Sequence, residues 1–553
     1  MQKLMVKKIK DPVYGYVTIP IQYIKDIIDN ALFQRLRRII QTSYSPLYSS
    51  ALHNRFVHSI GVLHLGKIVA ERLKLVIQEK KILDEEAAEK YANAYELACL
   101  LHDIGHAPFS HTGEIYYKND KFQVVDLHNR LCQLVPSKEF KEDLPSESDS
   151  AAPHEIMSAI VGIKEFGRII GDKENIELFA RCIVGYEYKN STKENEIKNC
   201  FIGMLNSKVI DVDRLDYLIR DAYTSGFATM SIDYERLLNA LTVVQKDGHY
   251  KIAYQKDAVS VIENVVYAHD AERKWIQNHP IVLYEAYIIK HILEHLNEEL
   301  NIEGHRLFSE ESLSKEGHCL KDGIKVSLLC DDDIVYLSKN IFNDELSDEF
   351  FERGKRRHPV WKSEEEYNAY IGALSTGGEL KVDFMECMKS FNESNIPDHP
   401  IPMKINESLI KMFEQELQDA KEKQQESKCN SKQVQAIKRK LEVCNYLKDY
   451  VSRKNLPFDF IIVQTSMFNS NFSKKHLGEM LIAFEKNDKV KVKMFKEVCN
   501  ILKADYGDKD FYYLFYRRKE SSEGNSGMID DIGNFCRGLY AAATKYDYDD
   551  DEV

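Results

Sequence analysis

The stretch that decides the fold is LLHDIGHAPFSH, residues 100–111. Just before it, apolar side chains recur at intervals of three and four residues, which predicts a helix over residues 93–104. Gly105 and Pro108 end that helix. The pair His102-Asp103 therefore lies where a helix opens into a loop, and two adjacent side chains can there converge on one ion.

The composition favours helices in the rest of the chain as well. Glycine and proline contribute 25 and 13 of the 553 residues, roughly 7%, whereas average usage gives about 12%. This shortage argues against collagen-like, linker-rich and turn-dense β proteins. Helical spacing predicts further helices over residues 27–40, 55–77 and 206–223, the last capped by Asn206 or Ser207.

The C-terminal half has a different pattern. Short runs rich in β-forming residues occur at residues 324–329 with 334–337, at 458–465 and at 511–516. Residues 413–447 are highly charged and predict a helical hairpin broken near residues 429–431. Residues 136–153 are polar and aperiodic, which predicts a loop or a disordered insertion.

We therefore expect a mainly α protein, a helical bundle with a smaller α+β lobe at its C-terminal end. Core size is not limiting, because a chain of this length has room for three or four domains of about 150 residues. The expected parts are a lead-in at residues 1–50, a helical core at 51–300, the α+β lobe at 301–540 and an acidic disordered tail at 541–553.

Charge and cysteine usage exclude several classes of protein. The formal net charge is −13, which disfavours the binding of long nucleic acid along one basic face. The 11 cysteines include no CxxC pair, so neither a disulfide framework nor a thiolate zinc site is expected. No apolar window is long enough for a membrane span or a signal sequence. We expect a soluble cytoplasmic protein without a membrane partner.

One phosphate-binding pattern is present only in its spacing. Residues 61–68, GVLHLGKI, match GxxxxGK, but Ile68 replaces the hydroxyl that would hold magnesium. The segment also lies within a predicted helix with no strand before it, so its amides are not free to bind phosphate. We do not expect a phosphate-binding loop here.

The histidines point to metal chemistry. Two imidazoles and two carboxylates from three predicted helices would form one set of ligands: His58, His102, Asp103 and Asp213. Such mixed N and O ligands suit iron, manganese, magnesium or zinc, and they leave positions open for water and a phosphate oxygen. A lone buried histidine is more often a hydrogen-bonded core residue, so the prediction depends on the combination.

Five motifs occur in order along the first half of the chain. They are DPVYGY (11–16), FQRLRRIIQ (33–41), HNRFVHSIGV (53–62), HDIGHAPFSH (102–111) and IDVDRLDYLIRD (210–221). Together they resemble the HD-domain metal phosphohydrolases, and within that family the deoxynucleoside triphosphate triphosphohydrolases. The resemblance covers residues 7–280.

The resemblance implies an HD-domain helical bundle and hydrolysis of a dNTP to a deoxynucleoside and inorganic triphosphate. The family's metal ligands carry over to His58, His102, Asp103 and Asp213. By this resemblance, water would attack the α-phosphorus, and a divalent metal ion would activate it. His111 would protonate the departing 5′-oxygen, Glu114 would orient His111, and His154 would be a second active-site histidine.

The resemblance also implies substrate contacts, at Gln41, Arg55, Arg214, Tyr217, Asp221 and Gln277. Arg55 would hold phosphate, and Gln41 would contact the sugar. In animal members a Tyr and a Leu crowd the sugar and reject a ribose 2′-hydroxyl. Ile276 and Thr42 stand at those positions, so the exclusion of ribonucleotides stays open.

An effector site for a guanine nucleotide or a dNTP is implied by four further matches, Lys7, Asp29, Gln34 and Arg37. Lys8 and Lys10 replace two neighbouring residues of the family, and the added positive charge would alter which phosphorylated effector binds. Alternatively, these residues form a solvated amphipathic helix with ion pairs. A working effector site would imply a homotetramer with coupling between effector and substrate sites.

Two other functions stay open. The chain would fit another HD-domain nucleotide phosphohydrolase, a nucleotidase or a phosphodiesterase, although the FQRLRRIIQ and DRLDY motifs argue against it. It would also fit a regulatory scaffold that binds nucleotide or nucleic acid around a structural HD site. The basic runs at residues 353–358 and 517–519 are compatible with the scaffold, but such runs are usually solvated faces.

Overall fold

The computed structural model divides into two compact units. The first comprises Met1–Ile276, Ile292–Phe342 and Asn469–Tyr506, and the second comprises Gln277–His291, Asn343–Phe468 and Gly507–Val553. The structure describes residues 5–44, 47–118, 125–146, 149–227, 231–342, 345–370, 384–393, 404–425, 431–465, 474–486, 489–500, 511–518, 529 and 531–545.

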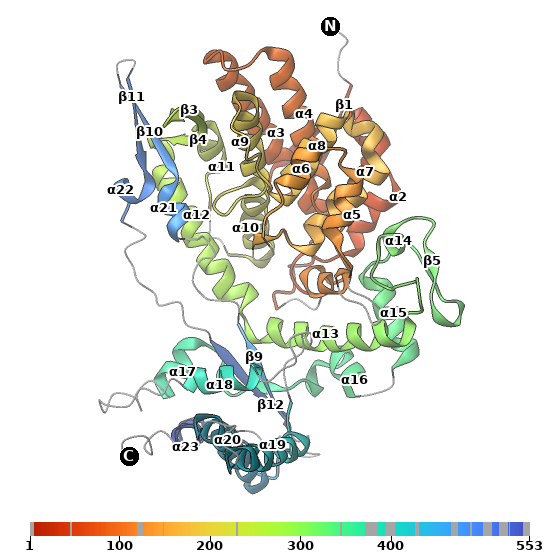
Figure 1. Cartoon of the computed structure of the whole chain (residues 1–553), viewed down its shortest axis with the longest axis vertical. Coiled ribbons are helices and arrows are strands. Elements are labelled where there is room, and N and C mark those ends of the chain that lie inside the picture. The colour runs from red at the N-terminus through yellow and green to blue at the C-terminus, as the bar shows by residue number, and fades with distance from the viewer. Residues whose placement is uncertain are drawn as a thin grey trace. The chain divides into compact units, whose positions relative to one another are not determined.

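Two long helices of the first unit, α3 (Arg55–Glu79) and α4 (Glu85–Leu101), pack side by side (Figure 1). Asn54 and Asp84 start them, since each side chain accepts a hydrogen bond from a backbone N–H of the first turn. The helix predicted over residues 55–77 is confirmed as α3. The helix predicted over residues 93–104 is the second half of α4, which begins earlier and ends at Leu101.

The other helices of this unit surround that pair. α8 and α9 pack against α4, α7 packs against α8, and α10 packs against α3. These and the remaining helices are α1 (Ile21–Tyr23), α2 (Ala31–Arg35), α5 (Leu127–Leu134), α6 (Lys138–Glu142), α7 (Pro153–Ile170), α8 (Lys173–Val184), α9 (Lys193–Leu205), α10 (Val212–Ser225), α11 (Tyr234–Asn239), α12 (Val259–Glu272), α14 (Glu310–Leu313), α15 (Asp331–Ile341), α21 (Lys474–Glu479) and α22 (Phe495–Val498). α13 (Pro280–Leu300) contributes residues to both units.

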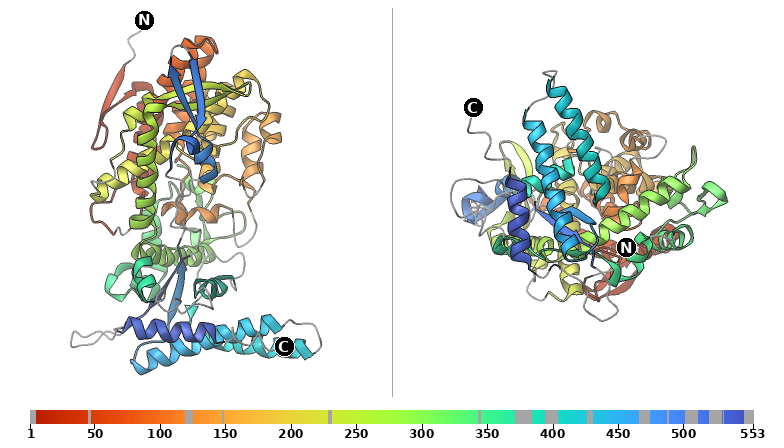
Figure 2. Two further views of the ribbon diagram at one scale, coloured as in Figure 1. Left: turned by 90° about the vertical axis from the view of Figure 1, so that its left-hand side faces the viewer. Right: turned by 90° about the horizontal axis from the view of Figure 1, so that it is seen from below.

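Small sheets complete the first unit. Its strands are β1 (Val6–Asp11), β2 (Gly15–Pro20), β3 (Leu241–Lys246), β4 (His249–Gln255), β5 (His318–Cys319), β6 (Lys325–Val326), β10 (Leu481–Lys486) and β11 (Lys489–Met494). β1 and β2 form an antiparallel hairpin, as do β5 and β6. The order β11-β10-β4-β3 joins two hairpins through a parallel pairing of β10 with β4 (Figure 2, left). Ala253 and Leu481 are buried at this junction.

The second unit contains the antiparallel sheet β7-β12-β9-β8 and helices. Its helices α19, α20 and α23 pack side by side (Figure 2). The elements are α16 (Glu345–Phe351), β7 (His358–Pro359), α17 (Glu364–Tyr370), α18 (Phe384–Glu393), β8 (Lys404–Ile405), α19 (Glu407–Gln425), α20 (Ser431–Arg453), β9 (Phe460–Gln464), β12 (Tyr512–Tyr516) and α23 (Ile532–Thr544). The strands predicted at residues 458–465 and 511–516 are confirmed as β9 and β12, and the charged hairpin is confirmed as α19 and α20.

Two segments differ from the prediction: a helix expected to be continuous is broken, and a segment expected to be a loop contains a helix. The single helix expected over residues 27–40 is a π-helical turn, Ile24–Ile28, followed by α2 and a 3₁₀ turn, Leu36–Arg38. Asn30 causes the break, because its side chain accepts a hydrogen bond from Leu32 N and starts α2. The aperiodic residues 136–153 contain the short helix α6, which Ser137 caps, so they are not a continuous loop.

Two further predictions are wrong in detail. The helix expected from residue 206 begins at Val212, because Asp211 supplies the N-terminal cap. Asn206 and Ser207, the two expected cap residues, do not cap it. The β-rich residues 334–337 lie inside α15, whose first turn carries three aspartates that favour a helix N-terminus. Of residues 324–329, only the two residues of β6 form a strand.

The mainly α fold predicted from the sequence is confirmed. No helix in the described part of the chain is both long enough and apolar enough to cross a membrane. α23 extends to Thr544, so the predicted tail overlaps a helix, and residues 546–553 lie outside the described residues. The four-part division and the cytoplasmic location stay predictions.

Candidate active site

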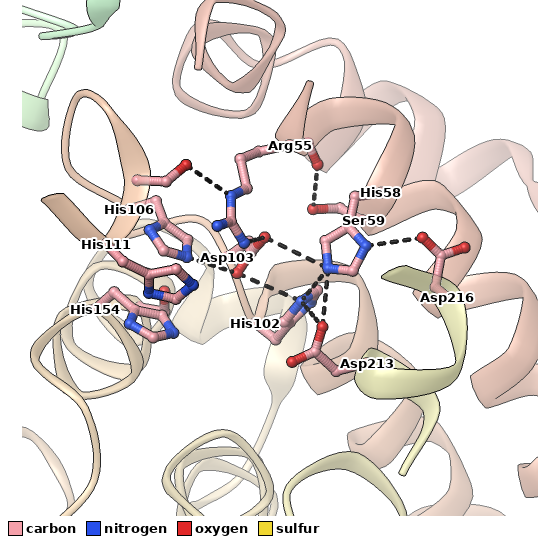
Figure 3. A network of polar contacts seen from close by, with 12 residues as sticks. Arg55, His58, Ser59, His102, Asp103, His106, His111, His154, Asp213 and Asp216 are labelled. Carbon is pink, nitrogen blue, oxygen red and sulfur yellow. Dashed lines mark hydrogen bonds and ion pairs between the residues drawn. The ribbon is translucent and has the colours of Figure 1, made fainter. Parts of the chain in front are cut away.

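Three helices bring the predicted metal ligands together (Figure 3). His58 lies on α3, one turn after Arg55. His102 forms the C-terminal cap of α4, and Asp103 follows it where the backbone leaves the helix. Asp213 lies in the first turn of α10. Residues distant in the sequence thus project into one small volume.

The ligand atoms of this group are close enough to share one ion. His58 Nε2 lies 2.9 Å from Asp213 Oδ1 and 3.2 Å from His102 Nε2. The Asp103 carboxylate lies 3.7 Å from His58 Nε2 and 3.4 Å from His102 Nε2. The three ligand atoms of His58, His102 and Asp213 all lie within 4.8 Å of one another. The structure gathers the four predicted ligands, while their function as ligands stays a prediction.

Both carboxylates of this group are ionised. Burial by itself raises the pKa of Asp103, but Arg55 and His102 hold it well below its usual range. The pKa of Asp213 is likewise held low against burial by hydrogen bonds from His102 and His58. Burial lowers the pKa of His58, but hydrogen bonds to its carboxylate partners dominate and raise the pKa to about 10. A bound cation would displace that proton.

Arg55 is an integral part of this group. It is 3% exposed, and its Nη1 donates to Asp103 Oδ2 at 2.9 Å. Its Nε donates to Ser110 Oγ at 3.1 Å, and that hydroxyl in turn donates to the Ile40 carbonyl at 2.7 Å. The predicted phosphate-binding arginine is therefore a fixed cation beside the candidate metal ligands.

A second group of histidines lies next to the first (Figure 3). The His106 ring stacks on the His154 ring, with centroids 4.1 Å apart and an interplanar angle of 14°. His111 approaches both edge-on, at centroid distances of 5.3 and 5.0 Å. His106 Nε2 lies 3.2 Å from Asp103 Oδ1. Asp103 therefore links the two groups, and His106 is a site residue to which the sequence reasoning gave no function.

Glu114 holds two of these histidines. Its Oε1 lies 3.3 Å from His111 Nδ1, and its other oxygen binds both the backbone N–H and Nδ1 of His154. Burial raises the pKa of Glu114, yet the two histidines hold it well below the usual range. Burial lowers the pKa of His154, but Glu114 raises it to about 9. The His111 side chain is 65% exposed, so a ligand from solvent can reach it.

Arg35 anchors the backbone between the two groups, and the sequence reasoning missed it. Its guanidinium donates to the carbonyls of His106 at 3.0 Å and Ile104 at 2.8 Å. The side chain is 4% exposed. An arginine in the otherwise apolar-spaced FQRL segment is the sequence signal that could have identified it.

Asp331 on α15 anchors the same loop farther along, and it was also missed. Its two oxygens accept from Phe109 N at 2.7 Å and from Ile40 N at 3.0 Å. Phe109 and Ser110 have φ of 58° and 53°, a left-handed conformation that costs non-glycine residues about 1–2 kcal/mol each. The buried carboxylate therefore stabilises the unusual backbone that directs His111.

The predicted substrate residues take several positions. Arg214 Nη1 donates to Asp211 Oδ2 at 3.1 Å, and Asp221 Oδ1 lies 2.6 Å from His53 Nε2. Tyr217 is half-buried on α10, and burial raises its pKa. Within the described residues, Gln41 Oε1 and Thr42 Oγ1 are buried without a hydrogen-bond partner, as expected of groups that await a ligand. Gln277 is exposed and belongs to the second unit.

The predicted effector residues lie near the N-terminus. Lys7 on β1 and Asp29 are exposed. Gln34 and Arg37 contact each other, since Arg37 Nε donates to Gln34 Oε1 at 2.8 Å. The Arg37 guanidinium also lies 3.5 Å from the centroid of the Phe56 ring. This geometry is compatible with base recognition and with a structural pair, so the effector site stays a prediction.

The first group fits a divalent cation by the chemistry of its donors. It offers two imidazole nitrogens and two ionised carboxylates within one ion's reach. Such a mixed set suits iron, manganese, magnesium and zinc alike.

The model of the HD domain matches residues 55–182, a range that includes Arg55, His58, the His102-Asp103 pair and the histidines that follow it. The chain carries an HD domain. The resemblance to the HD-domain family is thereby confirmed. The candidate ligand Asp213 lies C-terminal to the matched range.

Relatives of the chain extend this likeness. A protein of Dictyostelium discoideum named deoxynucleoside triphosphate triphosphohydrolase SAMHD1 homolog is 34% identical over 246 residues, 43% of this chain and 40% of that protein. Uncharacterized protein MG461 of Mycoplasma genitalium is 27% identical over 260 residues, 46% of this chain and 52% of that protein. The chain thus spans about half the length of these curated relatives.

A solved structure shares the fold over nearly the whole chain. It is a hypothetical protein from Aquifex aeolicus, 20% identical, with a TM-score of 0.52 and coverage of 93% of this chain and 97% of that one. The likeness concerns the fold alone.

Proposed function

We propose that the protein is a metal-dependent dNTP triphosphohydrolase. In this reaction water adds to the α-phosphorus, the bond from that phosphorus to the 5′-oxygen breaks, and the products are a deoxynucleoside and inorganic triphosphate. The observation that carries the proposal is the junction at Asp103, where a set of two histidines and two aspartates meets the group of His106, His111 and His154. The candidate metal ligands and the histidines that we assign to proton transfer therefore lie side by side.

Each group of site residues has its own function in the proposed reaction. A divalent cation bound by His58, His102, Asp103 and Asp213 would supply Lewis-acid activation of the phosphate ester. Arg55 places a fixed positive charge beside the Asp103 carboxylate. Glu114 engages His111 at Nδ1, which leaves Nε2 to donate a proton to the departing 5′-oxygen.

The relatives support dNTPs as the substrates. The Dictyostelium protein that is 34% identical to this chain is named as a deoxynucleoside triphosphate triphosphohydrolase. The match covers less than half of either protein, so the substrate class is part of the proposal. The buried, unpartnered Gln41 Oε1 is available for a sugar hydroxyl.

We include nucleotide activation and a homotetramer in the proposal. Lys7, Asp29, Gln34 and Arg37 would bind a guanine nucleotide or a dNTP as effector. Activity with a single dNTP would then rise when a second nucleotide is added, and the variant Asp29→Ala would lose that response.

The decisive experiment identifies products from each dNTP and NTP. Inorganic triphosphate and a nucleoside are expected, and His111→Gln should lose turnover while it retains the metal. His249→Gln is the matched control, because His249 is also exposed and its Nδ1 lies 2.6 Å from a glutamate, Glu196. Release of single phosphates would indicate a nucleotidase, and binding without hydrolysis would indicate a scaffold; either result would contradict the proposal.

A further inference from the structure

Three buried charges of the first unit have no part in the reaction proposed above. Asp11, Arg220 and Asp216 are 3%, 1% and 0% exposed, respectively. Burial of a charge is costly unless partners satisfy it. Each of these residues bonds to the next, and the series ends at the candidate metal ligand His58.

The contacts form one continuous chain from the N-terminal hairpin to His58. Asp11, the last residue of β1, accepts a hydrogen bond from Arg220 Nη1 at 3.0 Å. Arg220 donates from Nε and Nη2 to the two oxygens of Asp216, at 2.9 and 3.0 Å. Asp216 Oδ2 lies 2.7 Å from His58 Nδ1. Figure 3 shows Asp216 on the side of the His58 ring opposite Asp213.

The hairpin holds its end of this chain rigidly. Asp11 Oδ1 accepts from the backbone N–H groups of Val13 at 2.8 Å and Tyr14 at 3.0 Å, which closes the turn between β1 and β2. The Arg220 guanidinium carbon lies 5.5 Å from the centroid of the Tyr14 ring. The Asp11 carboxylate is therefore fixed to the turn, and one hydrogen bond joins it to Arg220.

The opposite wall, α3, admits the network only because residue 61 is glycine. A Cβ at Gly61 would lie 1.9 Å from Asp216 Oδ1 and 2.4 Å from Arg220 Nη2. This glycine opens the GxxxxGK match described above, and the structure gives it a packing function in place of a phosphate-binding one. The close approach puts Asp216 within hydrogen-bond reach of His58, one turn earlier on the same helix.

The contact with Asp216 fixes which His58 nitrogen is free. Both oxygens of Asp216 accept hydrogen bonds from the Arg220 guanidinium, so the carboxylate faces His58 as an acceptor. His58 Nδ1 must therefore carry a proton, and the lone pair of the neutral ring is left on Nε2. Nε2 is the atom that faces Asp213 and His102. Carboxylates in this position commonly orient metal-binding histidines.

We propose that Asp11, Arg220 and Asp216 form a positioning chain that sets the tautomer and orientation of His58 and couples the β1–β2 hairpin to the metal centre. The inference rests on the metal centre of the proposed function, but not on the identity of its substrate. Displacement of the hairpin withdraws Asp11 from Arg220, and the metal site weakens as a result.

The test measures Mn²⁺ affinity of the full chain by chelator competition, with no nucleotide present. Asp216→Asn should weaken binding about 10- to 100-fold, as loss of a residue that orients a metal ligand typically does. Asp11→Asn, which is farther from the ion, should weaken binding about 3- to 10-fold. Asp143→Asn is the matched control, since Asp143 accepts from the fully buried Arg181 at 2.8 Å but has no contact with the metal ligands. It should bind Mn²⁺ like the wild type.

Three outcomes would overturn the proposal. They are wild-type Mn²⁺ affinity in folded Asp11→Asn, a loss of Mn²⁺ affinity in Asp143→Asn equal to that in Asp11→Asn, and a wild-type protein that takes up no Mn²⁺. If Asp11→Asn fails to fold, Asp11→Glu replaces it, because the added methylene displaces the carboxylate while it keeps the charge; wild-type affinity there would be equally contrary. A protein that shows the expected order of Mn²⁺ affinities but hydrolyses no dNTP would contradict the proposed function alone.

Discussion

Substitution of Gly61 by alanine tests the link between packing and metal binding with a single methyl group. The new Cβ would lie 1.9 Å from Asp216 Oδ1, a separation that real Cβ atoms do not show. Asp216 must therefore move by about 1 Å or more. Its 2.7 Å contact with His58 Nδ1 would then break or distort.

The expected loss of stability combines two unfavourable contributions and one favourable one. Overpacking of a filled interior costs about 1–3 kcal/mol. Loss of a hydrogen bond to a charged group costs about 1.5–3 kcal/mol. Replacement of glycine by alanine inside a helix returns about 1 kcal/mol. We expect Gly61→Ala to be about 1.5–5 kcal/mol less stable than the wild type and to bind Mn²⁺ about 10- to 100-fold more weakly.

Two glycines of the same unit supply controls. A Cβ at Gly162 on α7 would lie 2.7 Å from Cζ of Phe179 on α8, so Gly162→Ala should lose stability without losing metal affinity. A Cβ at Gly167 on α7 meets no atom within 4 Å, so Gly167→Ala should be slightly more stable than the wild type.

Thermal unfolding with and without Mn²⁺, combined with chelator competition, separates the two effects. Stability should fall in Gly61→Ala and Gly162→Ala, whereas metal affinity should fall only in Gly61→Ala. Wild-type Mn²⁺ affinity in Gly61→Ala, or a loss of affinity in Gly162→Ala equal to that in Gly61→Ala, would refute the reasoning.

Three further predictions follow from the site. Asp213→Ala, or alanine at both His102 and Asp103, should abolish metal retention and hydrolysis together; metal analysis of the purified variants checks this, and full activity in a metal-free variant would contradict it. The pKa of His154 is raised to about 9, so its pairing with Glu114 stabilises the fold fully below about pH 6.5 and ceases to do so as the pH rises through 9; His154→Gln should therefore flatten the pH dependence of the thermal midpoint between those values, and an unchanged slope would count against the pairing. Asp331→Asn replaces one of two acceptors of buried N–H groups by a donor; we expect a loss of about 1–3 kcal/mol and a lower kcat with KM little changed, whereas wild-type kcat would show that the loop needs no such anchor.

The fold was predictable where the pattern is local. Apolar spacing identified α3 and the second half of α4, because each helix buries a continuous stripe, and high charge identified the α19–α20 pair. The spacing could not show the break at Asn30 or the start of α10 at Asp211, since a single side chain accepting a backbone N–H decides each. The β1–β2 hairpin was also missed, although its strands are adjacent in the chain, and the pairing of β10 with β4 was missed because strands distant in sequence leave no periodic signal.

The candidate site, like the fold, could be predicted only in part from the sequence. The four candidate ligands could be named from motif order and the resemblance, and the structure brings them together. The residues that hold them could not. Asp216 and Arg220 lie in the quoted DRLDYLIR segment, but only the fold shows that Arg220 joins Asp216 to Asp11, which is 209 residues before Arg220 in the chain. A buried network of charges depends on contacts between elements, and no spacing rule encodes those.

The most direct test of the central claim is one assay on metal-analysed wild-type protein. The protein is incubated with dGTP alone and then with paired nucleotides, and the products are identified. The account predicts a bound divalent metal, deoxyguanosine and inorganic triphosphate in equal amounts. Metal-loaded protein that releases only orthophosphate or pyrophosphate, or that leaves every dNTP intact, would contradict it.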